Sequence, residues 1–184
     1  MRVIGGSVKG QKLKTIKNYK IRPTSSKVKE ALFDILGNII ENRIGLDLFA
    51  GSGCLGIEAI SRGASKITFI EKDKGGFYIL RENLIRCGFK NHVYNIINTS
   101  VDRGINLLSR KNEKFSLVFL DPPYRQGLSE KTINLLISKD IIEEGAIIVV
   151  EHFYQEKLPS FKIIKTIKTR IYGETQITIM ERKE

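Results

Sequence analysis

The chain has 184 residues, of which 41% are hydrophobic and 28% charged, and it carries a net charge of +11. This size and balance fit one globular domain, and the lack of an apolar run of about 18 residues or of a signal-peptide block argues against a membrane span or export, so we expect a cytoplasmic protein. The two cysteines, Cys54 and Cys87, lack the spacing of a zinc site or a disulfide framework, and we expect reduced thiols and no metal.

The basic residues are concentrated at one end of the chain. Residues 1–29 hold nine lysines and arginines and no acid, so the rest of the chain carries a net charge of only +2. A local basic field attracts polyanions, and counterion release from nucleic acid is the usual driving force. We therefore expect nucleic-acid contact here, with a solvated lysine-rich end and an acidic membrane surface as alternatives. The candidate binding residues are Arg2, Lys9, Lys12, Lys14, Arg22 and Lys27.

The first 38 residues differ in pattern from the rest of the chain, and we interpret them as an appendage to one domain that spans residues 1–184. Gly5 and Gly6 lie between two short apolar stretches and indicate a small hairpin. The sequence RPTSS at residues 22–26 supplies a break and then helix-capping residues, so a helix is predicted over residues 27–36. The residues expected on its apolar face are Val28, Ala31, Leu32 and Ile35.

In residues 39–184, the core of the domain, short apolar runs alternate with longer segments of helical spacing. The predicted strands are residues 44–50, 66–71, 92–97, 115–120, 146–150, 161–172 and 176–181. The predicted helices are residues 54–62, 74–87, 101–109 and 129–137. This alternation predicts an α/β fold with a doubly wound, mostly parallel, seven-stranded sheet and helices on both faces. The YGET sequence between the last two strands predicts that they form an antiparallel hairpin.

A glycine loop follows the first predicted strand. It reads GSGCLG at residues 51–56, and Glu71 lies 20 residues after Gly51, which is the spacing of a dinucleotide fingerprint. Asp47, just before the loop, would repel a pyrophosphate but attract a ligand with a sulfonium and an ammonium group. The pattern therefore favours S-adenosylmethionine over a nicotinamide dinucleotide at the switch point of the sheet. A tight strand-to-helix turn without a ligand is the structural alternative.

The stretch FLDPPYRQG at residues 119–127 is a stiff loop at the end of the fourth predicted strand, so we expect it at the same sheet edge. An exocyclic base amine is a poor nucleophile because its lone pair is delocalised into the ring, and a catalyst must hold its hydrogens with acceptors. Asp121 offers a carboxylate, and Pro122 offers a carbonyl held by a restricted backbone. Tyr124 is expected to stack on the base. These three catalytic candidates predict methylation of a base amine, with an ordinary surface turn as the alternative.

Several segments together resemble a known family. DPPY (residues 121–124) and DLFAGSGCLGIEA resemble the signature and cofactor loop of class I S-adenosylmethionine-dependent methyltransferases, which have a Rossmann-like fold. RVIGGSVKGQKL, RPTSSKVKEALFDIL, GLDLFAGSGCLGIEAISRGA and YGETQI are similar to the bacterial RsmD-type enzymes, and the similarity covers essentially the whole chain. The resemblance implies methylation of the N2 amine of a guanine in 16S ribosomal RNA, with S-adenosylmethionine as cofactor.

The resemblance also implies roles for the matching positions. The glycine-loop backbone would hold the methionine part of the cofactor, Asp47 its ammonium group and Glu71 its ribose hydroxyls. Family members carry an acid after the third strand that binds the adenine amine; here Ser100 stands at that position, and Asp102 or a backbone group could substitute. The remaining candidate cofactor-binding residues are Phe49, Ala50, Gly51, Ser52, Gly53 and Lys72.

The implied partner is ribosomal RNA or a small-subunit assembly particle, gripped by the basic N-terminal residues, and we expect a monomer without membrane contact. Three other functions remain open: a DNA adenine-N6 methyltransferase, because the adenine amine poses a similar chemical problem; a nucleic-acid-binding protein that has lost catalysis; and a nicotinamide-dependent enzyme. Cys54, which has no basic neighbour to activate its thiol, is interpreted as a packing residue rather than a nucleophile.

Overall fold

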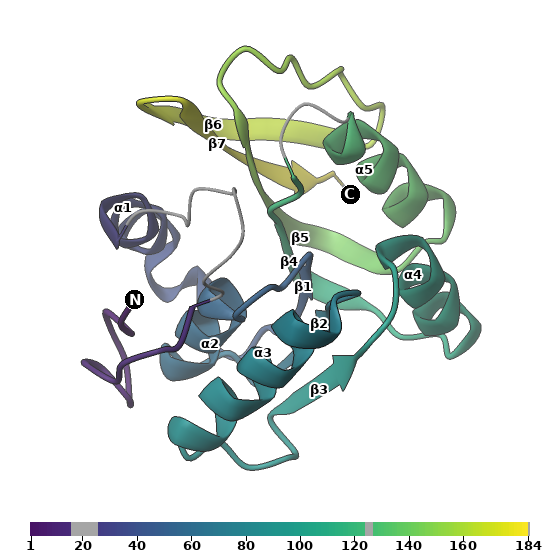
Figure 1. Cartoon of the computed structure of the whole chain (residues 1–184). Coiled ribbons are helices and arrows are strands. Elements are labelled where there is room, and N and C mark those ends of the chain that lie inside the picture. Colours follow the sequence, from purple (N-terminus) through teal and green to yellow (C-terminus); the bar gives the residue numbers. More distant parts are fainter. Residues whose placement is uncertain (16–25, 124–126, 184) are drawn as a thin grey trace.

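The computed structural model describes residues 1–15, 26–123 and 127–183, and within them the strands form one seven-stranded sheet (Figure 1). The strand order is β3-β2-β1-β4-β5-β7-β6, which confirms the predicted doubly wound fold. The strands are β1 (Ile44–Leu48), β2 (Lys66–Ile70), β3 (Tyr94–Ile97), β4 (Phe115–Leu120), β5 (Ile142–Phe153), β6 (Ile164–Tyr172) and β7 (Thr175–Arg182). The helices are α1 (Ser26–Leu36), the 3-10 turn η1 (Gly37–Ile40), α2 (Cys54–Ser61), α3 (Lys74–Arg86), α4 (Val101–Arg110) and α5 (Leu128–Ser138).

The sheet is parallel from β3 to β5 and antiparallel where β7 joins β5 and β6. The direction of winding reverses between β1 and β4, which pair directly, so their carboxyl ends form the switch point at which open α/β sheets bind ligands. The expected antiparallel hairpin closes the sheet at one edge as β6 and β7.

Helices cover both faces of the sheet, as expected for alternating strands and helices (Figure 1). The side chains of α1, α2 and α3 pack with one set of strand residues, represented by Phe69, Leu117 and Phe119. The side chains of α4 and α5 pack with the other set, represented by Ile70 and Val118. Successive strand residues alternate between the two faces, so the face of a residue at the sheet edge follows from the core cluster to which its strand neighbours belong. No helix in the described ranges is long and apolar enough to cross a bilayer.

Strand β5 is longer than its apolar run predicted. The prediction began at Ala146, but the strand begins at Ile142 and includes the exposed acids Glu143 and Glu144. Gly145 has a φ of 69°, and the register against β4 shifts between Phe115 and Leu117. The irregular backbone lets a polar stretch continue the strand, which a search for alternating apolar residues does not detect.

The predicted N-terminal hairpin is reduced to one antiparallel bridge between Arg2 and Lys12. It packs on the end of α2, where the amide of Ser7 donates to the carbonyl of Ser61 at 2.7 Å. Gly6 has a φ of 75°, and a Cβ there would lie 1.7 Å from that carbonyl oxygen, so only glycine allows this approach. The segment is therefore seated closely on the core of the domain.

Helix α1 lies close to its predicted position, and part of the predicted apolar face is confirmed. Val28 and Leu32 are buried as expected, and Ala31 and Ile35 are partly buried. Phe33 and Leu36, which were not predicted, are buried as well. The Phe33 ring lies 5.9 Å from that of Phe119, measured between centroids. The capping residues 22–25 that were expected before this helix lie outside the described residues.

Candidate functional site

The glycine loop leaves the end of β1 through a run of unusual backbone conformations. Phe49 and Gly51 have φ values of 61° and 55°, and Gly53 has a φ of 79°. The amide of Gly53 donates to the carbonyl of Ala50 at 2.7 Å, which closes the turn before α2. A positive φ at a phenylalanine costs about 1 to 3 kcal/mol and is found most often at functional sites. The Phe49 side chain itself packs against the α4 and α5 side of the core.

Two glycines of the loop are required by close packing. A Cβ at Gly53 would lie 2.2 Å from Leu80 of α3, and one at Gly56 would lie 2.3 Å from Phe69 of β2. The loop backbone consequently sits directly on the sheet and on α3, with Ala50 buried beneath it. Exposed backbone at a strand-to-helix turn is the surface against which a nucleotide-like ligand can approach closely.

Asp47 lies beneath this loop and is almost fully buried. Its Oδ2 accepts a hydrogen bond from the amide of Gly56 at 3.0 Å. Burial raises the pKa of Asp47 to about 7; the Gly56 hydrogen bond opposes this rise, and the charge of Glu71 adds to it. A buried carboxylate of this kind is stabilised by a nearby cation, which is the property expected of a site for an ammonium group.

Glu71 follows β2 and connects two loops through its carboxylate. Its Oε2 accepts from the amide of Gly51 and its Oε1 from the amide of Asp73, both at 2.7 Å. A Cβ at Gly76 would lie 3.0 Å from the Glu71 Cγ, so the glycine at this position leaves room for the side chain. Each carboxylate oxygen has capacity for a second hydrogen bond, and the pair therefore suits two adjacent ribose hydroxyls. The neighbouring Lys72 is exposed.

The position assigned to adenine recognition is half-buried. Ser100 is the N-cap residue of α4, yet its side chain makes no capping hydrogen bond. Asp102, the proposed substitute, forms an ion pair with Lys131 of α5 at 2.7 Å. Asn98, which was not predicted, donates from Nδ2 to the carbonyl of Glu71 at 2.7 Å and joins the ends of β2 and β3. The Ser100 hydroxyl is therefore more available to the adenine amine than the carboxylate of Asp102.

Asn83 of α3 is a second residue that the sequence did not single out. It is fully buried, and its Nδ2 donates to the carbonyl of Ser52 at 2.9 Å and to that of Lys14 at 3.0 Å. Its Oδ1 accepts from the amide of Lys14 at 2.8 Å. One side chain thus holds both the glycine loop and the basic N-terminal segment.

Asp121 and Pro122 follow β4 at the same sheet edge. The register pairs Leu48 with Leu120, so the glycine loop and the Asp121 loop leave neighbouring strand ends at the same level. Neighbouring strands lie about 4.8 Å apart, which places the two loops side by side. Asp121 is half-buried and Pro122 is buried. Tyr124 lies outside the described residues.

A further acid stands beside Asp121. The register pairs Leu120 with Val150, so Glu151, the next residue of β5, lies level with Asp121, the first residue after β4, and Glu151 is buried. Burial raises the pKa of the Cys54 thiol to about 12, with Asp47, Asp121 and Glu151 adding to the rise and Lys29 opposing it. A thiol with this pKa is not a nucleophile at neutral pH, which supports the interpretation of Cys54 as a packing residue.

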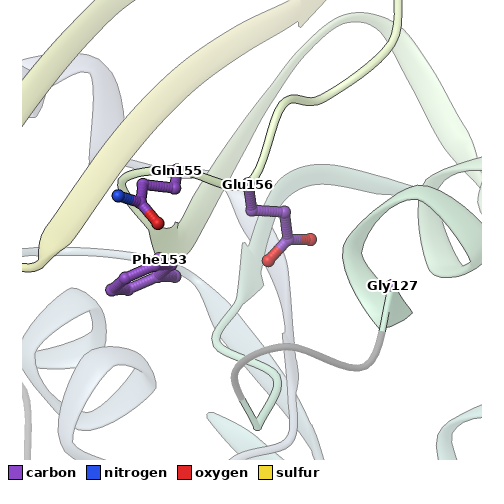
Figure 2. A pocket seen from close by; sticks show the side chains of 4 residues that line it. All are labelled: Gly127, Phe153, Gln155 and Glu156. Atoms are coloured by element: carbon purple, nitrogen blue, oxygen red, sulfur yellow. The ribbon is translucent and has the colours of Figure 1, made fainter.

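An open pocket of about 460 Å³ lies next to this side of the edge, lined by Gly127, Phe153, Gln155 and Glu156. Figure 2 shows the Phe153 ring below Gln155, and the Glu156 side chain extending toward Gly127 at the start of α5. The lining residues come from the end of β5, the segment that follows it and the start of α5. In the described part of the chain, no group of histidine, cysteine or acidic residues is suited to a metal ion.

The basic N-terminal residues Arg2, Lys9, Lys12, Lys14 and Lys27 are exposed, and Arg22 lies outside the described residues. Lys14 also forms an ion pair with Glu82. Lys29, counted in the basic field, is instead fully buried, with its Nζ 3.0 Å from Glu58 and donating to the carbonyl of Arg2 at 2.7 Å. The surface field therefore has one cation fewer than the sequence suggested.

Glu58 of α2 holds the N-terminal segment in place. It is fully buried, and its carboxylate accepts from the amides of Ile4 and Gly5, both at 2.8 Å, and from Arg62 at 2.9 Å. Burial alone would raise the pKa of Glu58, but the Ile4 and Arg62 hydrogen bonds and the charge of Lys29 outweigh it and hold the pKa below its usual value. The segment is thus anchored by an ionised group inside the protein.

Comparison with known proteins places this site in context. The family model described as Conserved hypothetical protein 95 matches residues 1–181. The ribosomal RNA small subunit methyltransferase D of Escherichia coli is 38% identical over 184 residues, which cover 100% of this chain and 90% of the relative. The enzyme of the same name from Buchnera aphidicola (strain APS) is 39% identical, covering 89% and 82% of the two chains. A solved Escherichia coli structure, yhhF, matches with a TM-score of 0.86 at 34% identity, over 100% of this chain and 98% of that one.

Proposed function

The chain belongs to the family of the ribosomal RNA small subunit methyltransferases D, and from this membership and the geometry of the sheet edge we propose that it methylates the N2 amine of a guanine in 16S ribosomal RNA, with S-adenosylmethionine as methyl donor. The names of the relatives support the substrate class. The observation that carries the proposal is the pairing of Leu48 with Leu120, because it brings the glycine loop and Asp121 to neighbouring strand ends.

The β1 and β2 side of the edge fits S-adenosylmethionine. Asp47 would answer the ammonium group, the backbone from Ala50 to Gly53 would hold the methionine part, and Glu71 would bind the ribose hydroxyls. A phosphate-bearing cofactor fits poorly, since two buried acids line this side and would repel it. When bound, the cofactor supplies a methyl group made electrophilic by the sulfonium.

The β4 and β5 side would hold the base. The Asp121 carboxylate and the Pro122 carbonyl would accept the two hydrogens of the amine and fix the direction of its nitrogen. Asp121 is also placed to take the proton that the nitrogen loses on methylation. Because the two loops leave strand ends about one strand spacing apart, positioning of the amine against the methyl donor would supply most of the rate. Tyr124 would stack on the base.

The exposed cations of residues 1–15, together with Lys27, would grip the RNA backbone. A target base in a paired or stacked region must be extruded at a cost of a few kcal/mol, and backbone contacts of this kind offset that cost. We place the enzyme in the cytoplasm, where it would act on ribosomal RNA or a small-subunit assembly particle.

The decisive experiment is methyl transfer from labelled S-adenosylmethionine to 16S ribosomal RNA and to small-subunit particles from cells that lack the enzyme, followed by nucleoside analysis. We expect the label in N2-methylguanosine. Duplex DNA with adenine-rich sequence is the comparison substrate. Label in N6-methyladenine of DNA, or none in either nucleic acid, would contradict the proposal.

A further inference from the structure

Strand β6 carries a row of cations on a single face. Regular alternation would place Lys165 on one face of the sheet and both Lys168 and Arg170 on the other. The register against β7 shifts between Thr166 and Lys168, and the shift pairs Lys165, Lys168 and Arg170 with Glu181, Ile179 and Ile177 in that order. Those three partners alternate along β7 and share a face, so the irregularity gathers the three cations on one side.

This face is the one on which Asp121 lies. Ile177 and Ile179 pack in the core beneath α1, α2 and α3, together with Leu117 and Phe119 of β4. Asp121 continues the Leu117 and Phe119 series by one more alternation, so it points to the same side. The cations of β6 and the proposed catalytic acid therefore face the same solvent region.

The register also gives the separation. Arg170 pairs with Ile177, Ile177 pairs with Glu151, and Glu151 stands beside Asp121. Three strand spacings of about 4.8 Å place the Cα atoms of Arg170 and Asp121 about 14 Å apart on one row of the sheet. A strand of a few nucleotides spans this distance, so the backbone on one side of a bound target nucleotide would reach β6.

The charge on this face is available for a ligand. Lys165 is paired with Glu181 at 2.7 Å, whereas neither Lys168 nor Arg170 has an acidic partner among the residues that the structure describes. Arg170 is exposed and Lys168 is half-buried. The sequence carries the same signal, because residues 157–172 contain five lysines and arginines and no acid.

Aromatic side chains complete the face. Tyr172 follows Arg170 on the same side and packs against the core cluster beneath α1. Tyr172 pairs with Thr175, which pairs with Phe153 of the open pocket, so the two aromatic residues share one row of the sheet, next to the row that joins Arg170 to Asp121. Cations that follow a backbone, together with rings on which bases stack, are the features of surfaces that bind single-stranded nucleic acid.

We propose that this face of β6, formed by Lys168, Arg170 and Tyr172, binds the RNA strand that flanks the target nucleotide. The inference rests on the proposed function and adds a second contact surface to the N-terminal one. The exposed isoleucines of this strand, Ile167 and Ile171, would suit a protein partner better. Ile171 pairs with Gln176 and so lies on the opposite face, and the cationic face favours a polyanion.

The test compares Lys168→Gln/Arg170→Gln with a matched control, Arg110→Gln/Lys139→Gln, which removes the same two charges at the exposed ends of α4 and α5, at the amino edge of the sheet. Binding to protein-free 16S ribosomal RNA is measured over a series of salt concentrations. Each phosphate contact to a single strand contributes about 0.7 to the slope of log K against log[salt], so we expect the β6 variant to lose about 1.4 of slope and the control none. Lys168→Arg/Arg170→Lys should retain the slope.

The melting temperature and the Kd for S-adenosylmethionine are measured alongside and should match the wild type in all variants, which separates loss of RNA contact from misfolding. A wild-type enzyme that methylates RNA while the β6 variant keeps the full slope overturns this inference alone. If the β6 variant keeps the full slope but methylates small-subunit particles less well than the wild type, the partner of β6 is a ribosomal protein. A wild-type enzyme without RNA methylation would instead refute the proposed function.

Discussion

The two sides of the sheet edge hold their acids differently. On the β1 and β2 side, Asp47 accepts from the amide of Gly56, and Glu71 accepts from those of Gly51 and Asp73. On the β4 and β5 side, Asp121 is followed by two prolines, which have no amide hydrogen to donate. Backbone amides therefore orient the acids of the cofactor side, whereas the two residues that follow Asp121 have no amide to offer its carboxylate.

This difference separates two tasks. Amides that bind the acids of the cofactor side also fix the glycine loop, so that side is shaped before any ligand arrives. The prolines stiffen the Asp121 loop while they remove donors that would compete with a base amine for its carboxylate. We therefore expect substitutions on one side to affect binding of the cofactor and substitutions on the other to affect methyl transfer.

Asp121→Asn should break the reaction most. It replaces the carboxylate by an amide of equal size, whose oxygen still accepts a hydrogen bond but which has no charge and cannot take the amine proton, and we expect methyl transfer to fall by about 10³ to 10⁴. The Kd for S-adenosylmethionine, measured by calorimetry, should stay within about twofold of wild type. Asp47→Asn is the matched control and should weaken cofactor binding more than it lowers the rate at saturation. An active Asp121→Asn enzyme would remove Asp121 from the chemistry.

Glu58→Gln tests whether the N-terminal segment belongs to the RNA side of this division. The change leaves Lys29 buried without a charged partner, and we expect a loss of about 3 to 5 kcal/mol in the free energy of unfolding, measured with urea. The KM for RNA should rise while the Kd for the cofactor changes little in the folded fraction. Glu82→Gln, which removes the exposed ion pairs with Lys14 and Arg86, should cost much less stability, because solvent screens exposed pairs. Equal costs for the two variants would contradict the anchoring role of Glu58.

The parallel sheet and the two loops at its edge could be predicted from the sequence because crossover connections force parallel strand ends to one side. The burial of Lys29 could not be predicted, because its partner Glu58 lies in another helix and a lysine is normally expected at the surface. The cationic face of β6 was not predicted, for a different reason. Strict alternation assigns Lys165 and Lys168 to opposite faces, and only the pairing with β7 reveals the shift.

The candidate site divides in the same way. Asp47, Glu71 and Asp121 stand next to strand ends, where a motif shows them. Asn83 joins Ser52 and Lys14 across 31 and 69 positions of the chain, and no local pattern marks such contacts. Residues that position a loop from a distant helix are visible only after the fold is known.

Asn83→Ala tests whether a buried side chain that holds the glycine loop contributes to cofactor binding. The buried amide and carbonyls that it leaves unpaired should cost about 1 to 3 kcal/mol of stability. Because one of them belongs to Ser52, the Kd for S-adenosylmethionine should rise roughly tenfold, which is about 1.4 kcal/mol. Asn98→Ala is the control: its side chain is exposed, so water can replace its hydrogen bond to Glu71 and the effect should be smaller. Loss of stability with unchanged cofactor affinity would make Asn83 a structural residue only.

The last test uses pH to change the charge of Asp47. Its pKa of about 7 means that the carboxyl group loses its charge as the solution becomes more acidic, so the Kd for the cationic cofactor should rise up to tenfold per pH unit below pH 7. The free protein should show the opposite trend: a folded-state pKa raised from 3.8 makes this group's contribution to stability complete below pH 4 and lost as the pH rises through 7. Asp47→Asn should abolish both trends in the difference from wild type. If the Kd and the stability depend on pH in opposite directions, and both dependences disappear in Asp47→Asn, then the buried charge of Asp47 serves cofactor binding. A Kd that does not depend on pH would show that Asp47 holds only the amide of Gly56.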